Sequence, residues 1–213
     1  VSSKIKIMNT VIKDSLQGSM SYSTYRNLVK ILVEENSNSG IEKNEDLANY
    51  TVLNDKRMNR WDKTLKISEE SQLKLSFFNS NITWLVITES WCGDAAHIVP
   101  VLYKIAEHIN INFRVVLRDE NLELMDMFLT NGARAVPKLI MIDNVSGEVL
   151  NTFGPRPSKA TQMVLDYKAK HGVITPEFKE DLQLWYNKDK GQNIVNDITE
   201  LLCKLEPSIC QQN

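Results

Sequence analysis

The sequence has 213 residues, of which 42% are hydrophobic and 24% are charged, and its formal net charge is −2 with a pI of about 6.0. This composition is that of an ordinary globular protein, and the length predicts one domain with extensions. Because the chain has no excess of positive charge, we expect neither a nucleic-acid partner nor binding to an anionic membrane surface.

The first 80 residues are predicted to be mainly helical. Apolar side chains recur at helical spacing over residues 21–35 and again over 46–66, and a third helix is expected to begin at 68–71. The polar segment 36–40 between the first two helices has the composition of a loop. We therefore expect residues 1–80 to form a helical extension that packs on the core of the protein.

The pattern changes at residue 82. Residues 82–88 are short, β-branched and apolar, which predicts a buried strand, and residues 113–117 predict a second one. Between them, residues 94–110 predict a helix with Pro100 inside it, where a proline should produce a kink. Two strands joined through a helix are expected to lie parallel.

The next segments predict one more helix and a β-hairpin. A helix is expected over residues 122–131, with Gly132 as its terminating residue. Residues 138–142 and 148–153 are expected to form the two strands of the hairpin. The remaining helices are expected over 156–171 and, starting with a proline in its first turn, over 176–205.

This order of elements predicts an α/β fold. A parallel pair of strands followed by a hairpin gives a central mixed sheet, with helices flanking both of its faces. We expect the domain itself to span residues 81–171 and residues 172–213 to form a C-terminal helical extension.

The cysteines and the N-terminus indicate where the protein works. Three cysteines, Cys92, Cys203 and Cys210, do not form the pattern of a disulfide framework, and the last two are expected to be packing or surface thiols. The first residues contain no signal-peptide pattern, and no apolar run approaches the roughly 20 residues that span a bilayer. We expect a cytoplasmic protein with no membrane association.

The most informative segment is Trp91-Cys92-Gly93-Asp94-Ala95, which directly follows the first expected strand. Pro100 lies in the next helix, and Gly132-Ala-Arg-Ala-Val-Pro137 precedes the first strand of the hairpin. In this order, the three features resemble the thioredoxin superfamily over about residues 82–171. The closest resemblance is to a bacterial thioredoxin-like group that has a helical N-terminal extension and Trp-Cys-Gly-Asp in place of Trp-Cys-Gly-Pro.

The resemblance implies a thioredoxin fold and a functional site. Cys92 would be the nucleophile, at a helix N-terminus where the helix dipole and free N–H groups favour the thiolate. The Val136-Pro137 bond would be cis and would offer a backbone edge to an extended substrate. The residues implied to bind substrate are Trp91, Gly93, Asp94, Val136 and Pro137.

Two departures from the thioredoxin pattern limit this chemistry. Ala95 stands in place of the resolving cysteine, and Val86 stands where thioredoxins carry a buried acid. A dithiol reaction is therefore excluded at this site. Asp94 replaces a proline, and it is expected to cap the helix while its charge opposes a thiolate at Cys92.

Three functions remain open at this stage. In the first, Cys92 forms mixed disulfides with protein thiols or disulfides, and a low-molecular-weight thiol such as glutathione or bacillithiol resolves them; this predicts a lowered pKa and partial exposure. In the second, the domain is a non-catalytic peptide-binding module, which predicts a buried or unperturbed Cys92. In the third, a monothiol-glutaredoxin-like protein binds an iron–sulfur cluster.

Neither a cofactor nor a metal is expected in the first two of these functions. His97 is interpreted as a polar residue on a helix face, with a Cys92/Asp94/His97 metal site as the alternative.

Overall fold

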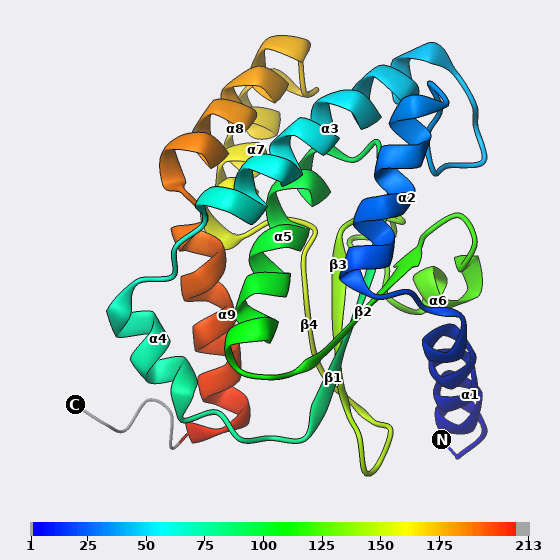
Figure 1. The fold of residues 1–213 in the computed structure, drawn as a ribbon, viewed down its shortest axis with the longest axis vertical. Coiled ribbons are helices and arrows are strands. Elements are labelled where there is room, and N and C mark those ends of the chain that lie inside the picture. Colours follow the sequence, from blue (N-terminus) through cyan, green and yellow to red (C-terminus); the bar gives the residue numbers. More distant parts are fainter. Residues whose placement is uncertain (1, 208–213) are drawn as a thin grey trace.

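A four-stranded sheet lies at the centre of the computed structural model, which describes residues 2–207 and, from residue 8 onward, their side chains (Figure 1). The strand order is β2-β1-β3-β4. β1 pairs with β2 in parallel and with β3 antiparallel, and β3 pairs with β4 antiparallel. The predicted mixed sheet is therefore confirmed. The strands are β1 (Ile82–Thr88), β2 (Asn112–Leu117), β3 (Lys138–Asp143) and β4 (Val149–Phe153).

The helices cover both faces of the sheet unequally (Figure 1). One face carries only α1 (Ser2–Gly18) and the short α6 (Leu122–Met127), which enclose the smaller of two apolar cores. The larger core lies on the other face. Its helices are α2 (Tyr22–Glu34), α3 (Glu45–Thr64), α4 (Glu69–Ser76), α5 (Gly93–His108), α7 (Ser158–His171), α8 (Pro176–Asp189) and α9 (Gln192–Leu205).

β1 separates the two cores because successive side chains of a strand point to opposite faces. Trp84 and Val86 belong to the larger core, whereas Leu85 and Ile87 belong to the smaller one. All seven residues of β1 are buried, which explains its continuous apolar sequence.

Helix-capping residues fix where several of these helices begin. Ser21, Asn44, Ser68 and Thr175 each accept a hydrogen bond from the backbone N–H three residues later, at the start of α2, α3, α4 and α8 respectively. Within the described residues, no helix is both long and apolar enough to cross a membrane.

The structure corrects two predicted helix ends. The single helix expected over 176–205 is broken at Lys190-Gly191, where both residues have positive φ (56° and 78°). The helix expected to reach residue 131 ends at Met127. Gly132 does not terminate it but forms a turn with Asn131, both at positive φ, between Thr130 and Ala133.

A buried charge network joins the N-terminal helices to each other. Arg26 on α2 is 6% exposed and contacts the Asp55 and Asp62 carboxylates of α3 at 3.0 and 3.1 Å. Asn59, one turn from each aspartate, accepts a further bond from Arg26 at 2.8 Å. The network thus attaches α2 to α3. Because α3 in turn packs against α5, both helices are connected to the helix that begins at Cys92.

Candidate functional site

Cys92 lies at the N-cap of α5, just after the tight turn that follows β1. The residue is partly exposed and packs at the junction of the two cores. Its Sγ donates a hydrogen bond to the carbonyl of Val136 at 3.2 Å. The Val136-Pro137 bond is cis, as the resemblance to thioredoxins implied. The structure therefore brings Cys92, Val136 and Pro137 together, although Val136 itself is only 6% exposed.

The Cys92 thiol is protonated in this environment. Burial of the sulfur, together with the neighbouring Asp94 carboxylate, raises its pKa to about 12. The backbone N–H groups of Ala95 and Asp94, together with Arg156, lower the pKa, but they do not offset burial. The lowered pKa that the redox hypothesis predicts is not found in the resting structure, whereas the partial exposure that it also predicts is found.

Asp94 does not cap α5, contrary to our expectation, but points into the protein. Its side chain accepts a hydrogen bond from the Tyr186 hydroxyl at 2.9 Å and forms an ion pair with Arg156 at 2.7 Å. Burial raises the pKa of Asp94, and Arg156 opposes this shift. Asp94 is 8% exposed, so it acts on Cys92 through its charge while Tyr186 of the C-terminal extension holds it in place.

His97 is a fully buried core residue, whereas we interpreted it as a residue on the polar face of a helix. The Trp61 indole N–H donates to His97 Nδ1 at 2.9 Å, which leaves the proton on Nε2, 2.8 Å from the Gln183 amide oxygen. The ring stacks on Tyr186 at 4.5 Å, and burial lowers the pKa of His97 to about 3. Both ring nitrogens are engaged, and the described residues contain no group of three potential metal ligands. The metal-site alternative is therefore wrong.

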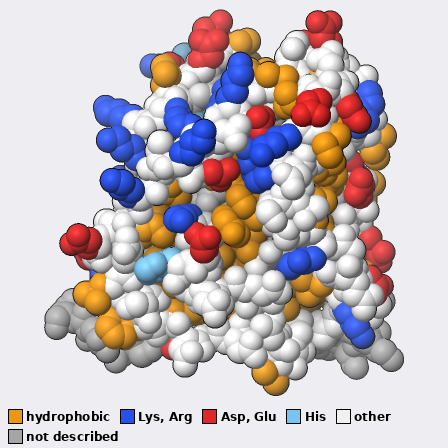
Figure 2. Space-filling view, viewed as in Figure 1, with side chains coloured by type: hydrophobic (Ala, Val, Ile, Leu, Met, Phe, Trp, Pro, Cys, Tyr) orange, Lys and Arg blue, Asp and Glu red, His pale blue; other side chains and the backbone are white. Residues whose placement is uncertain are grey.

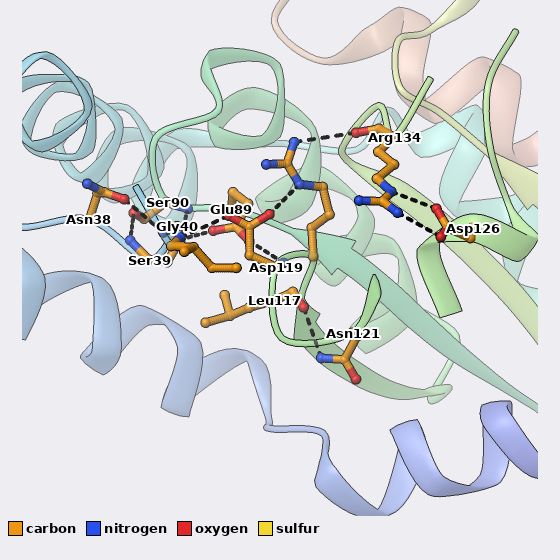
Figure 3. A network of polar contacts seen from close by, with 12 residues as sticks. Asn38, Ser39, Gly40, Glu89, Ser90, Leu117, Asp119, Asn121, Asp126 and Arg134 are labelled. Carbon is orange, nitrogen blue, oxygen red and sulfur yellow. Dashed lines mark hydrogen bonds and ion pairs between the residues drawn. The ribbon is translucent and has the colours of Figure 1, made fainter. Parts of the chain in front are cut away.

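The loop between α2 and α3 packs against the residues that directly precede Trp91 and Cys92, and Figure 3 shows Ser39 and Gly40 beside Glu89 and Ser90. The backbone N–H groups of Ser39 and Ser90 each donate to the other residue's hydroxyl, at 2.9 and 2.8 Å. A Cβ on Gly40 would lie 2.8 Å from the Trp91 indole nitrogen, so any larger residue would displace that ring. The N-terminal extension thus forms one wall of the site, which the sequence did not indicate.

We expected Trp91 to contact the substrate, but other side chains cover much of its ring. The Arg118 guanidinium lies over its ring at 4.8 Å and pairs with Asp119 at 2.7 Å. Its indole nitrogen is buried without a hydrogen-bond partner.

A buried acid that sequence reasoning missed lies beside this loop. Val86, at the position expected of the thioredoxin acid, is apolar and fully buried, but Glu89, the residue directly after β1, is also fully buried. Its carboxylate accepts from the Ser39 hydroxyl and from the Asp119 N–H, the latter at 2.9 Å, and burial raises its pKa (Figure 3). The sequence did offer one indication that Glu89 is buried, namely its position directly after an apolar strand.

Gly154 brings a second loop onto the cis-proline segment. It has φ of 108°, and a Cβ there would lie 2.2 Å from the Pro137 carbonyl oxygen. The following bond to Pro155 is also cis. Arg156 follows two residues after Gly154 and pairs with Asp94. The Cys92 side of the site and the cis-proline side are thereby joined.

Among the described residues, no second cysteine completes a dithiol site. Ala95 is buried at the position of a resolving cysteine. Cys203 packs partly buried on α9 and is disulfide-bonded, so it is not the free thiol that we expected. Cys210 lies outside the described residues.

Comparison with known proteins identifies the family. A thioredoxin family model matches residues 40–170, well over half of the chain. A crystal structure of a protein of unknown function from Pseudomonas aeruginosa is similar in fold, with a TM-score of 0.53 and 15% identity over 76% of this chain and 91% of that one. An HIV epitope scaffold covers 86% of this chain and 98% of its own at 17% identity, with a TM-score of 0.49. No curated protein matches the sequence. With its mixed sheet, the helix beginning at Cys92 and the opposing cis-proline loop, the chain belongs to the thioredoxin family, whose fold is associated with thiol redox chemistry.

Proposed function

We propose that the protein exchanges disulfides through a single cysteine, Cys92. The observation that carries this proposal is the position of the Cys92 sulfur. The sulfur lies at the start of α5, 3.2 Å from the Val136 carbonyl on the cis-proline loop, in a residue that is partly exposed as a whole. An extended partner that pairs with this backbone edge would bring its own sulfur to Cys92. Trp91, Gly93, Val136 and Pro137 would contact the partner, whereas Asp94 would set the pKa of the thiol.

The reaction would proceed in two exchange steps. The Cys92 thiolate attacks one sulfur of the partner's disulfide, that S–S bond breaks, and the other sulfur leaves with the electron pair as a thiolate. The proton of the Cys92 thiol passes to solvent. A separate thiol, such as glutathione or bacillithiol, then attacks the mixed disulfide and restores Cys92, because Ala95 offers no second sulfur. A cytoplasmic location, which supplies such thiols, is part of this proposal.

The raised pKa makes this a partner-activated reaction. With a pKa of about 12, on the order of one Cys92 in 10⁵ is a thiolate at pH 7. A partner N–H that donates to the Val136 carbonyl would compete with the Cys92 S–H for the same acceptor. It would thereby weaken an interaction that favours the protonated form. Resting Cys92 should accordingly react slowly, though measurably at high pH, with small disulfides and oxidants, and much faster with docked partners.

The same raised pKa favours a second candidate function, a non-catalytic module that binds an extended peptide. In this case the thiol serves only as a hydrogen-bond donor to Val136, and Trp91 and the cis-proline loop bind the peptide without forming a covalent bond.

An adduct assay separates the two candidates. Wild-type protein and a Cys92→Ser variant are incubated with excess glutathione disulfide at pH 8 to 9, and intact mass is recorded over time. Disulfide exchange predicts one glutathione adduct on the wild type that is absent from Cys92→Ser and is removed by added glutathione. If no adduct forms on the wild type, the exchange proposal is wrong and the binding module remains. In a coupled assay with thioredoxin reductase, insulin reduction should stay near background.

A further inference from the structure

Two arginines on α3, Arg57 beside Gly93 and Arg60 one turn later, form no ion pair with a described carboxylate. Arg57 is partly buried, and its Nη1 donates to the Asn54 amide oxygen at 2.7 Å. Arg60, one turn later, donates to the Asn187 amide oxygen and lies over the Trp61 ring at 5.1 Å. Among the side chains described, neither guanidinium has a carboxylate oxygen within 4.0 Å.

Arg57 lies against the residue that follows the reactive cysteine. A Cβ placed on Gly93 would be 3.6 Å from Arg57 Nη1 and 3.5 Å from both amide atoms of Gln183. The orientation of Arg57 is fixed through Asn54, which accepts from Arg57 and itself donates to the Ser90 carbonyl at 2.8 Å. The Arg57 guanidinium is thus a positioned charge at the edge of the site.

The two charges act on each other and on the active-site helix. Burial lowers the pKa of Arg57, and the neighbouring Arg60 lowers it further. Both arginines also contribute to the lowered pKa of His97 on α5. Arg57 is partly buried and Arg60 is exposed, and the repulsion between their like charges costs free energy that an anion bound at Arg57 would recover.

The other arginines of the site are already neutralised. Arg156 pairs with Asp94 at 2.7 Å, and Arg118 pairs with Asp119 at the same distance. Of the described arginines around the site, Arg57 on α3 is therefore the one beside Gly93 that forms no ion pair, although the more distant Asp94 carboxylate also raises its pKa. Lys and Arg side chains are prominent over the part of the surface where α3 and α8 lie, although acidic side chains lie among them (Figure 2).

We propose that Arg57, assisted by Arg60, selects exchange partners that carry a carboxylate close to the reacting sulfur. This inference rests on the proposed function of Cys92. When the partner's sulfur reaches Cys92, a carboxylate a few atoms away would lie beside Gly93, within reach of the Arg57 guanidinium and the Gln183 amide. Asp94 would not repel it strongly, because Arg156 already compensates that charge.

The test compares an anionic and an uncharged aromatic disulfide on the full chain. The anionic probe is 5,5′-dithiobis(2-nitrobenzoate), which carries two carboxylates, and the uncharged probe is 4,4′-dithiodipyridine. Each reaction forms a mixed disulfide on Cys92 and releases one coloured thiol or thiolate, so its rate is followed by absorbance. A Cys92→Ser variant supplies the background from other sites.

Three variants of α3 isolate the role of the charge. Arg57→Gln should slow the anionic probe about 3- to 10-fold and the uncharged probe less than about 2-fold. Arg57→Lys should restore most of the rate with the anionic probe. Lys63→Gln removes the same charge from an exposed position of the same helix and should change neither rate. Raising the salt from about 50 to 300 mM should slow only the anionic probe on the wild type, a measurement that needs no variant.

The possible outcomes are distinct. Equal slowing of both probes by Arg57→Gln, or no slowing of either, would overturn the selection proposal while leaving exchange at Cys92 intact. If wild-type Cys92 reacts with neither probe, the proposed function fails and this inference fails with it. Glutathione disulfide and a disulfide-linked peptide with Glu beside its cysteine, each compared with its amidated form, then distinguish a small acidic thiol from an acidic protein segment.

Discussion

The buried His97 makes the stability of the protein sensitive to acid over a defined range. An unfolded histidine takes up a proton near pH 6.5, whereas the native ring, held by Trp61 and Gln183, does so only near pH 3. Between these values the unfolded state binds more protons than the native state. The contribution of His97 is therefore complete above pH 6.5 and is lost as the pH falls towards 3.

The size of this loss follows from the shift in pKa. Each pH unit in that range costs about 1.4 kcal/mol, so lowering the pH from 6.5 to 5.0 should remove about 2 kcal/mol from the free energy of unfolding. Glu89 and Asp94, whose pKa values are raised by burial, act in the opposite direction. The informative quantity is therefore the difference between the wild type and a variant in which residue 97 does not titrate.

Urea unfolding, followed by tryptophan fluorescence at pH 7.0, 6.0 and 5.0, measures this difference. His97→Gln can still accept from Trp61 and donate to Gln183, but it cannot take up a proton. The variant should be less stable than the wild type at pH 7, yet it should lose about 2 kcal/mol less on acidification. His108→Gln, at an exposed histidine, should behave as the wild type does. Equal acid losses in the wild type and His97→Gln would refute the assignment of His97 as a buried neutral ring.

Three further substitutions test how the site is held together. Gly154→Ala places a methyl group against the backbone of the cis-proline loop and should lower the free energy of unfolding, measured in urea, by more than about 2 kcal/mol. The control Gly132→Ala, also at positive φ but in open space, should lower it by about 1 kcal/mol. Similar losses in the two variants would contradict the close approach of Gly154 to Pro137. Arg26→Met should lower the free energy of unfolding by about 2 kcal/mol, because it leaves two aspartates without their cation; calorimetry that finds no loss would show that the network is dispensable. Asp94→Asn should lower the pKa of Cys92, read from the pH dependence of alkylation; an unchanged profile would mean that burial alone sets that pKa.

The sequence predicted those features that depend on local pattern. The buried strand β1 and the hairpin of β3 and β4 follow from short apolar runs bounded by polar turns. The cis bond before Pro137 followed from resemblance, and the structure confirms it.

The features that were not predicted depend on contacts between distant segments. The break at Lys190-Gly191 was hidden because the helical pattern continues on both sides of it. The sign of the Cys92 pKa shift depends on how deeply the sulfur is buried, which no local pattern reports. Likewise, only the folded chain shows that the loop around Ser39 closes over Trp91 from fifty residues away.

The pH dependence of Cys92 alkylation tests the central claim most directly. Wild-type and Cys92→Ser proteins are treated with iodoacetamide between pH 6 and 10, and labelling is followed by intact mass. A protonated resting thiol with a pKa of about 12 predicts slow labelling that rises about tenfold per pH unit and shows no plateau up to pH 10. Fast labelling that reaches a plateau below pH 8 would contradict the account and show that Cys92 rests as a thiolate.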